Sequence, residues 1–279
     1  MPNDQLNTSS PVRQRVRLII RISQNALSFA VGDPTAPLQV DYEPYPVRNG
    51  ISIAANLREA FKQSELLNKK YNRALVLIDS PVLLVPISEF DESEKETIYH
   101  HTFSGMEGNA ILQQILPDQN AVALFSINKD LKTVIEDHFD NIRFIHLVQP
   151  VWNYLQLHSF NGVRQKLYCY FHDKKLEVFT FEKKRFRFCN SFDADHSHDA
   201  VYYILYVWKQ LGLDVQHDEI YLVGEIPEIE WMTEALHHYV KKVFKLNNRF
   251  SELQINKIAS NPLTVNMPFD IQTLYINEK

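Results

Sequence analysis

The stretch that decides the fold runs from Gln165 to Pro227 and reads QKLYCYFHDKKLEVFTFEKKRFRFCNSFDADHSHDAVYYILYVWKQLGLDVQHDEIYLVGEIP. Apolar and aromatic residues form runs of strand length in it, and short polar turns separate the first three runs, as in a β-meander. A longer apolar segment and one more run follow. The pattern predicts three strands, a helix and a fourth strand, in this order: Leu167–His172, Leu176–Glu182, Phe186–Phe192, Asp199–Leu211 and Glu219–Val223.

The helix predicted in this stretch is apolar on nearly all of its sides. Residues 200–208 read AVYYILYVW, without a charged residue. A helix that faces water on one side normally carries polar residues there. We therefore expect this helix to be pressed between a sheet and other elements.

The first part of the chain shows the same order of elements. Apolar runs bounded by turn residues predict three strands, a helix and a fourth strand: Val16–Ile22, Ala26–Gly32, Leu38–Tyr45, Ile51–Lys69 and Arg73–Asp79. The last of these strands has no apolar–polar alternation, as expected for a parallel strand covered on both faces. Because the two stretches share one order of elements, we predict an internal duplication.

Further elements lie between and after the two stretches. They are a strand, a helix, a hairpin, a helix, a strand and a helix, followed after Val223 by one long helix: Pro81–Ile87, Asp91–Thr102, Ala110–Leu116 with Ala121–Ile127, Asn128–Phe139, Ile142–Leu147, Pro150–Ser159 and Glu228–Phe244. We predict a disordered tail over residues 1–15, a first lobe with an inserted hairpin and helices over 16–160, and a second lobe over 161–279. The region from Asn247 onward is expected to hold a final strand and a short helix.

The composition predicts a globular protein in a reducing compartment. Hydrophobic residues are 45% and charged residues 23% of the 279, and the formal net charge is −5. This acidity does not favour nucleic acid as a partner. No apolar run is long enough to cross a bilayer, and the polar N-terminus lacks the apolar core of a secretory signal. We expect a cytoplasmic protein in which Cys169 and Cys189 are free, buried thiols.

Two copies of three strands, a helix, a strand and a helix resemble the actin-like ATPase fold, whose halves are each ribonuclease-H-like. The chain is more specifically similar to an uncharacterised bacterial family of about this length with an actin-like ATPase fold. The resemblance covers residues 16 to about 245 and rests on the order of elements. It implies an α/β fold of two lobes related by duplication, with a cleft between them.

The resemblance also shows where nucleotide chemistry would lie. Members of this fold that use ATP carry an Asp-x-Gly-type turn between strands one and two of each half, where glycine admits the phosphate and the carboxylate organises Mg²⁺. The corresponding turns here are Ile22–Ala26 and Phe171–Lys175, and neither contains glycine. The glycine pair that contacts adenosine would fall at Val223–Glu225, where one glycine remains.

The phosphate-binding motifs are therefore absent or degenerate. The vestigial candidates for a nucleotide site are Asp173, Gly224 and Glu225, and we assign no catalytic residue, no metal ligand and no cofactor, with Mg-ATP disfavoured. An aspartate in a hairpin turn normally stabilises the turn by hydrogen bonds to the backbone. A glycine after a strand normally belongs to the connection between that strand and a helix. On these grounds we favour a non-enzymatic role over an enzymatic one.

Three other patterns have an alternative functional interpretation. The segment Asp193–Asp199 contains carboxylates and histidines that suit zinc or iron, but helix capping at Asp195 or Ser197 also explains it. The basic residues of 174–187, interleaved with phenylalanines, resemble a nucleic-acid-binding face, although charged hairpin tips also protect sheet edges. A two-metal nuclease would need carboxylates on the central strands, and Val16–Ile22 has none.

Three functional hypotheses follow from these observations. The first is a non-catalytic, actin-like scaffold or assembly protein that binds a protein partner or itself. The second is a divergent nucleotide-binding protein or ATPase of the same superfamily, and the third is a small-molecule sensor that uses the cleft. The first is favoured because catalysis needs residues that the turns lack, whereas partner binding needs only surface.

Overall fold

A computed structural model of the chain describes residues 17–32, 40–69, 71, 73–159, 164–246 and 267–276. The tail predicted over residues 1–15 and most of the region predicted from Asn247 lie outside these residues. No helix in the described part of the chain is both long and apolar enough to span a lipid bilayer.

The first five-stranded sheet has the strand order β3-β2-β1-β4-β8. Strands β1, β2 and β3 form an antiparallel meander, and β4 and β8 extend it in parallel. β1 and β4 are buried along nearly their whole length because helices or other chain segments cover both faces. The strands are Arg17–Ile22 (β1), Leu27–Gly32 (β2), Val40–Tyr45 (β3), Ala74–Ile78 (β4) and Ile142–His146 (β8).

The second five-stranded sheet repeats this topology with the strand order β11-β10-β9-β12-β13. Strands β9 to β11 again form an antiparallel meander, and β12 and β13 extend it in parallel. The strands are Lys166–His172 (β9), Lys175–Glu182 (β10), Arg185–Asp193 (β11), Glu219–Gly224 (β12) and Val243–Lys245 (β13). The duplication predicted from the order of elements is thus present in the order of the strands and extends to the fifth strand of each sheet.

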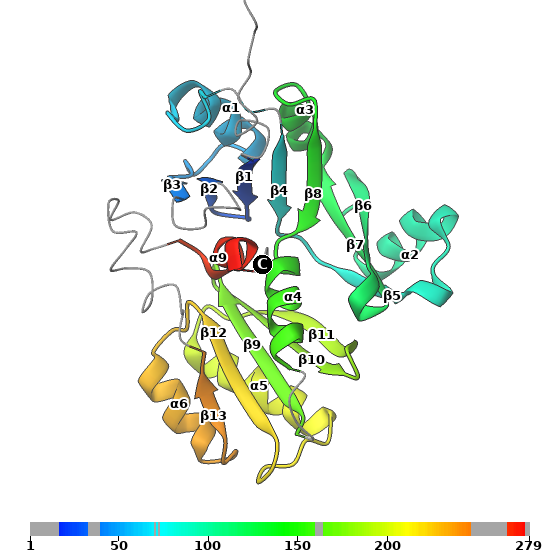
Figure 1. Ribbon diagram of the computed structural model, residues 1–279, viewed down its shortest axis with the longest axis vertical. Coiled ribbons are helices and arrows are strands. Elements are labelled where there is room, and N and C mark those ends of the chain that lie inside the picture. Colours follow the sequence, from blue (N-terminus) through cyan, green and yellow to red (C-terminus); the bar gives the residue numbers. More distant parts are fainter. Residues whose placement is uncertain are drawn as a thin grey trace, which may run out of the picture.

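Helices cover the outer face of each sheet and separate the two sheets (Figure 1). Helices α1 and α3 pack on the first sheet, and α5 and α6 pack on the second. Helices α4 and α9 lie between the sheets and contact each other. The bounds are Ile53–Gln63 (α1), Lys129–Glu136 (α3), Gln149–His158 (α4), Ser197–Gln210 (α5), Ile229–His237 (α6) and Phe269–Ile276 (α9).

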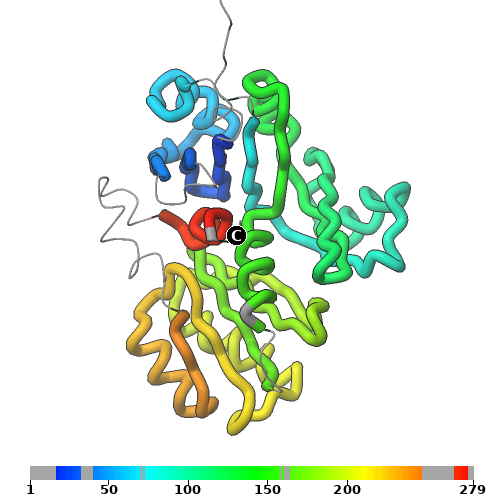
Figure 2. Tube along the Cα trace, in the orientation of Figure 1, coloured from blue at the N-terminus to red at the C-terminus, as the bar shows by residue number. Residues whose placement is uncertain are grey.

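The inserted hairpin forms a third sheet beside the first one. Its order is β5-β7-β6, and the predicted pairing around residues 117–120 is present, with Leu116 opposite Ala121. The elements are Leu83–Pro86 (β5), the 3-10 turns Ile87–Glu89 (η2), Glu92–Glu94 (η3) and Pro117–Gln119 (η4), and Lys95–Thr102 (α2), Asn109–Leu116 (β6) and Ala121–Asn128 (β7). Figure 2 shows that this insertion extends to one side of the molecule.

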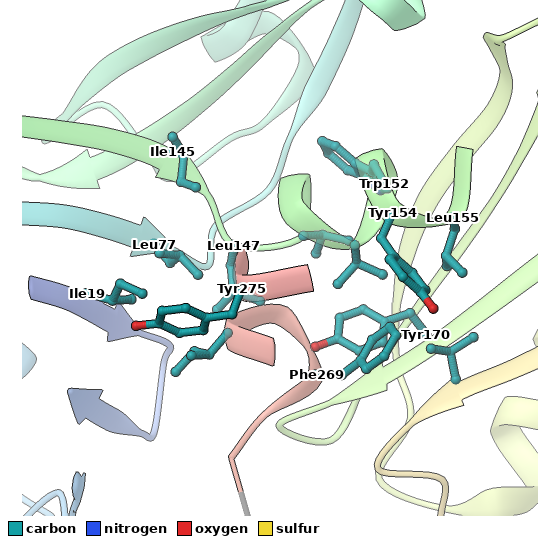
Figure 3. Packing of buried hydrophobic residues seen from close by; sticks show 14 of the residues in the cluster. Ile19, Leu77, Ile145, Leu147, Trp152, Tyr154, Leu155, Tyr170, Phe269 and Tyr275 are labelled. Carbon is teal, nitrogen blue, oxygen red and sulfur yellow. The ribbon is translucent and has the colours of Figure 1, made fainter. Parts of the chain in front are cut away.

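A single apolar core connects the two five-stranded sheets through α4 and α9 (Figure 3). Ile19 and Leu77 enter it from the first sheet, and Tyr170 enters it from the second. Trp152 and Leu155 of α4 are completely buried in it. The two sheets therefore share buried surface, and burial of apolar surface is the main stabilising term in a folded domain.

Several details differ from the sequence-based expectation. The helix predicted over Ile51–Lys69 ends at Gln63, and the helix predicted over Asp91–Thr102 begins at Lys95, after a 3-10 turn. The helix predicted over Glu228–Phe244 ends at His237, and its last residues form the edge strand β13. Val243 can face the core from either structure, so its burial did not distinguish helix from strand. The predicted free thiols are present, but Cys189 is only half-buried. Cys169 and Cys189 lie on β9 and β11, which flank β10, and strands two apart are about 9–10 Å apart, too far for a disulfide.

Candidate functional site at the junction of the two sheets

The carboxyl ends of β1 and β4 lie side by side and face the second sheet. Ile22 pairs with Ile78 in the parallel ladder, so Arg21 and Asp79 are brought to the same edge. The β9–β10 hairpin and the first turn of α9 approach this edge from the other side. We refer to this region as the junction. It lies beside the two turns, Ile22–Ala26 and Phe171–Lys175, where the resemblance to the actin-like ATPase fold implies that phosphate would bind.

Arg21 is the centre of the junction. Its side chain is 3% exposed, and its Nε lies 3.0 Å from each carboxylate oxygen of Asp270 on α9. Its Nη2 donates to Asp173 Oδ2 at 2.6 Å. The hydroxyl of Tyr170 also donates to Asp270, at 2.9 Å. Burial alone would lower the pKa of Arg21, but the charges of Asp270 and Asp173 outweigh it and raise this pKa.

A second ion pair connects the same two sides. Lys175, the first residue of β10, places its Nζ 3.1 Å and 3.0 Å from the two carboxylate oxygens of Asp79. The Asp79 side chain is 2% exposed and that of Lys175 is 19% exposed. The two ion pairs therefore join the ends of β1 and β4 to one hairpin of the second sheet.

His172 supports the hairpin from within. Its Nδ1 lies 3.3 Å from Asp173 Oδ2, and its Nε2 lies 3.6 Å from Glu177 Oε1. Burial alone would lower the pKa of His172, but its contacts with Asp173 and Glu177 outweigh this and raise it to about 9. Burial would likewise raise the pKa of Asp173, yet the hydrogen bond from His172 and the charge of Arg21 hold it well below its usual range. Both shifts favour the charged forms, a protonated His172 beside an ionised Asp173.

The β9–β10 turn reaches this geometry without glycine. Asp173 and Lys174 both have positive φ, 44° and 64°, as in the two-residue turns that fit a twisted hairpin. Asparagine, aspartate or glycine is usual in such positions, and lysine is strained there. The side chain of Lys174 extends outward and lies 3.5 Å from Asp195.

Close packing of the backbone explains why residue 224 is a glycine. This residue has φ +87°, and a Cβ on it would lie 2.3 Å from the backbone oxygen of Phe171. The next residue, Glu225, donates its backbone N–H to the same oxygen. Burial and the charge of Asp173 raise the pKa of the Glu225 carboxyl. Asp173, Gly224 and Glu225, the three candidates from the sequence, are therefore neighbours, but a close approach of backbones accounts for the glycine.

Sequence reasoning missed the ion pairs of the junction. Arg21 binds Asp173 and Asp270, and Lys175 binds Asp79, and each pair joins residues too far apart in the sequence for any local motif. One signal was present: Arg21 is the only charged residue inside the apolar run of residues 18–22. A charge buried in a central strand needs a partner, so this arginine predicts a carboxylate on a facing element.

The other candidate sites have structural partners in the described residues. In Asp193–Asp199 the helix begins after His196, and not after Asp195 or Ser197 as the capping pattern predicted. Ser197 donates to Glu228, and the ring of His198 lies 4.1 Å from that of Trp231. Among the described residues, no group of three or more histidine, cysteine, aspartate or glutamate side chains is placed to hold a metal ion.

Comparison with known proteins agrees with the overall fold. The chain is similar to a protein from Bacteroides thetaiotaomicron whose crystal structure shows an actin-like ATPase fold and unknown function. The identity is 26% and the TM-score 0.80, over 95% of this chain and 96% of that chain. It also resembles a chain of the PilM-PilN type IV pilus biogenesis complex, with 10% identity and a TM-score of 0.53, over 95% of this chain and 99% of that chain. No curated protein matches the chain.

The fold predicted from the order of elements, an α/β actin-like ATPase fold, is thereby confirmed. A family model described as protein of unknown function, DUF3822, matches residues 7–243. This match covers most of the chain, so the chain belongs to the DUF3822 family.

Proposed function

We propose that this chain is a non-catalytic actin-like protein that acts as a scaffold or assembly component by binding a protein partner. The observation that carries the proposal is the junction, where two buried ion pairs stand between the turns that bind phosphate in ATP-using relatives of the fold. The cations of Arg21 and Lys175 are each neutralised by a buried carboxylate. A phosphate would have to displace those carboxylates, and breaking a buried ion pair costs about 3–5 kcal/mol.

The backbone of the two turns also supports the proposal. A tight phosphate site uses several backbone N–H groups that point at one anion, and glycine lets the phosphate approach them. The turn after β1 contains Ser23, Gln24 and Asn25, and the turn after β9 contains Asp173 and Lys174. None of these residues is glycine, so neither turn offers the bare backbone that such a site uses. Asp173 is engaged by Arg21, which is unlike the solvated carboxylate that organises Mg²⁺.

An assembly role needs surface only, and the fold accommodates it. One similar structure is a complex of two proteins in type IV pilus biogenesis. At 10% identity the likeness concerns the fold alone, so it sets a precedent for an actin-like chain in a protein complex without identifying a partner here.

Thermal melting of the purified protein with and without millimolar Mg-ATP tests the proposal. A ligand present at a hundredfold its dissociation constant stabilises by about 2.7 kcal/mol. For a chain of this size that is a rise in melting temperature of roughly 5–10 °C. We expect no rise beyond the one given by Mg²⁺ alone, and no phosphate release above background.

The variants Asp173→Ala and Asp195→Ala separate turnover by this protein from contamination. Asp173 lies in the junction, whereas Asp195 is 61% exposed and pairs with Lys174 at the tip of the same hairpin. Trace hydrolysis that is equal in wild type and both variants supports the proposal. Mg-dependent hydrolysis that Asp173→Ala abolishes and Asp195→Ala retains would reject it in favour of a divergent ATPase.

A further inference from the structure

Helix α5 leaves an apolar face uncovered. The sequence predicts that a helix with AVYYILYVW at its centre is covered all round, and its inner face is indeed buried through Ala200, Ile204 and Val207. Its outer face is open among the described residues, however, because Tyr202 is 63% and Tyr206 is 49% exposed. An apolar face that the fold itself does not cover marks an interaction site.

Helix α6 lies beside this face and completes a groove. The groove has a volume of about 610 Å³, and its walls are Tyr202 with His198 from α5 and Trp231 with Tyr239 from α6 and the residues that follow it. Trp231 is 37% and Tyr239 63% exposed. We refer to these four residues and Glu234 as the aromatic groove. It lies on the helical layer of the second sheet, on the side away from β9 and β12.

The exposed aromatics are concentrated in this one place. Ten large apolar side chains are exposed in the described part of the chain, and four of them lie on or next to the α5–α6 pair. Trp and Tyr are the residues that most often dominate the energy of protein interfaces. Ring contacts hold them in place: His198 lies 4.1 Å from Trp231, and the Tyr202 and Tyr206 rings stack at 6.2 Å.

The charges around the groove select the kind of partner. Glu234 lines it, and the first turns of the two helices carry Asp199 and Glu230. Helix α6 contains no lysine or arginine, and α5 has only Lys209, in its last turn. Lys241 and Lys242 follow Tyr239, and Lys242 donates to the backbone oxygen of His217. Aromatic faces bordered by carboxylates attract lysine and arginine side chains, whose cations stack on the rings.

We propose that the aromatic groove binds a basic amphipathic segment of a partner protein, with leucine-like anchors between the aromatic rings and arginine or lysine side chains against Tyr202, Trp231 and Glu234. A groove between two helices has the shape that accepts an amphipathic helix. The inference deepens the proposed scaffold function and rests on it for its biological meaning, but it concerns residues distant from the junction.

Selection from a random library of displayed peptides tests the proposal. The full-length protein serves as bait, and a Tyr202→Ser/Trp231→Ser double variant serves for counter-selection. We expect enrichment of net-positive peptides with apolar residues at helical spacing. The affinity of a selected synthetic peptide for wild type should fall at least tenfold in the double variant and should weaken with added salt.

Two controls make the result specific. Leu157→Ser and Ile115→Ser remove exposed apolar side chains elsewhere, 64% and 62% exposed, and should leave peptide affinity unchanged. These two control variants should melt close to wild type because the replaced side chains are mostly exposed. Thermal melting of the double variant checks that its loss of affinity is not a loss of folding. Failure to obtain peptides that distinguish wild type from the double variant, or enrichment of acidic peptides, would overturn the proposal.

A second copy of this chain could also occupy the aromatic groove. Sedimentation of the wild-type protein tests this alternative. A monomer agrees with the proposal, whereas a dimer that the double variant dissociates would overturn it and make the groove a self-interface. Binding of Mg-ATP would reject the proposed function and leave these outcomes unaffected, so the two failures are distinguishable.

Discussion

Gly224 is the residue whose replacement should have the largest local effect. It has φ +87°, and an added Cβ would lie 2.3 Å from the Phe171 oxygen. Gly50 has nearly the same φ, +88°, but open space around the position of a Cβ. Gly224→Ala therefore combines strain with a backbone clash, whereas Gly50→Ala has strain alone, about 1–2 kcal/mol.

We expect Gly224→Ala to lower the free energy of unfolding by at least about 3 kcal/mol, because the clash forces β9 and β12 apart in addition to the backbone strain. Urea unfolding of both variants measures the difference. Equal losses in the two variants would show that the approach of Gly224 to Phe171 is not a structural constraint.

For single residues, the sequence predicted which positions lie at the candidate site better than it predicted what each residue does there. It selected Asp173, Gly224 and Glu225, which the structure brings together. It treated Asp173 as an ordinary turn residue, and the loss of one ordinary hydrogen bond costs about 1 kcal/mol. The bond from buried Arg21 changes this expectation, because removing Asp173 leaves part of a buried guanidinium unpaired. No local pattern could show this, since the partners are 152 residues apart.

The β9–β10 hairpin makes the stability of the protein depend on pH. The pKa of His172 is about 9 in the folded protein and about 6.5 in an unfolded chain. Folding is therefore favoured by protonation of His172: this stability is fully present below about pH 6.5 and is lost as the pH rises through about 9.

His172→Gln should remove this dependence. We expect the variant to be less stable than wild type by on the order of 2–3 kcal/mol at pH 6, and the difference to shrink as the pH rises toward 10. Denaturant unfolding of both proteins at several pH values gives the difference, and contributions from groups that do not contact His172 cancel in it. His101→Gln, at an exposed position of α2, provides a matched control for the replacement of a histidine away from the hairpin. A difference that grows with pH would contradict the assignment of a charged His172.

The elements themselves were largely predictable because each has a local cause. Runs of apolar residues between polar turns located the strands of both meanders, and period and capping located most helices. Two elements departed for tertiary reasons. The edge strand β13 was predicted as helix because Val243 is compatible with either, and pairing with Ile220 on β12 decides the matter. Helix α5 was expected to be covered on all sides, and its open face at Tyr202 became visible only once α6 was placed beside it.

For the whole molecule, the order of elements predicted the duplication but not how the copies meet. The lobe boundary placed between residues 160 and 161 remains a prediction. Helix α9, assigned to the second lobe by its position in the sequence, contacts both sheets: Tyr275 lies against Gly32 of β2, and Phe269 packs on Tyr170 of β9. The junction depends on this placement because α9 supplies Asp270. Such contacts join residues that are far apart in the sequence and leave no periodic signal.

The continuous core predicts that the two sheets unfold together. Leu155 on α4 is completely buried in the core that connects them, whereas Leu157 on the same helix is 64% exposed. Leu155→Ala should lower the free energy of unfolding by about 2–5 kcal/mol, and Leu157→Ala by no more than about 0.5 kcal/mol. Unfolding should remain one transition in wild type and in both variants, because a loss at α4 weakens the packing of both sheets at once.

The measurement is urea unfolding followed by tryptophan fluorescence and by far-ultraviolet circular dichroism. Trp152 reports on the core between the sheets, and Trp208 and Trp231 report on the helices of the second sheet. Transitions that coincide for the two probes agree with a single cooperative unit. A second transition in Leu155→Ala, with one sheet still folded, would show instead that each sheet is stable with its own helices and that the core at α4 only holds them together.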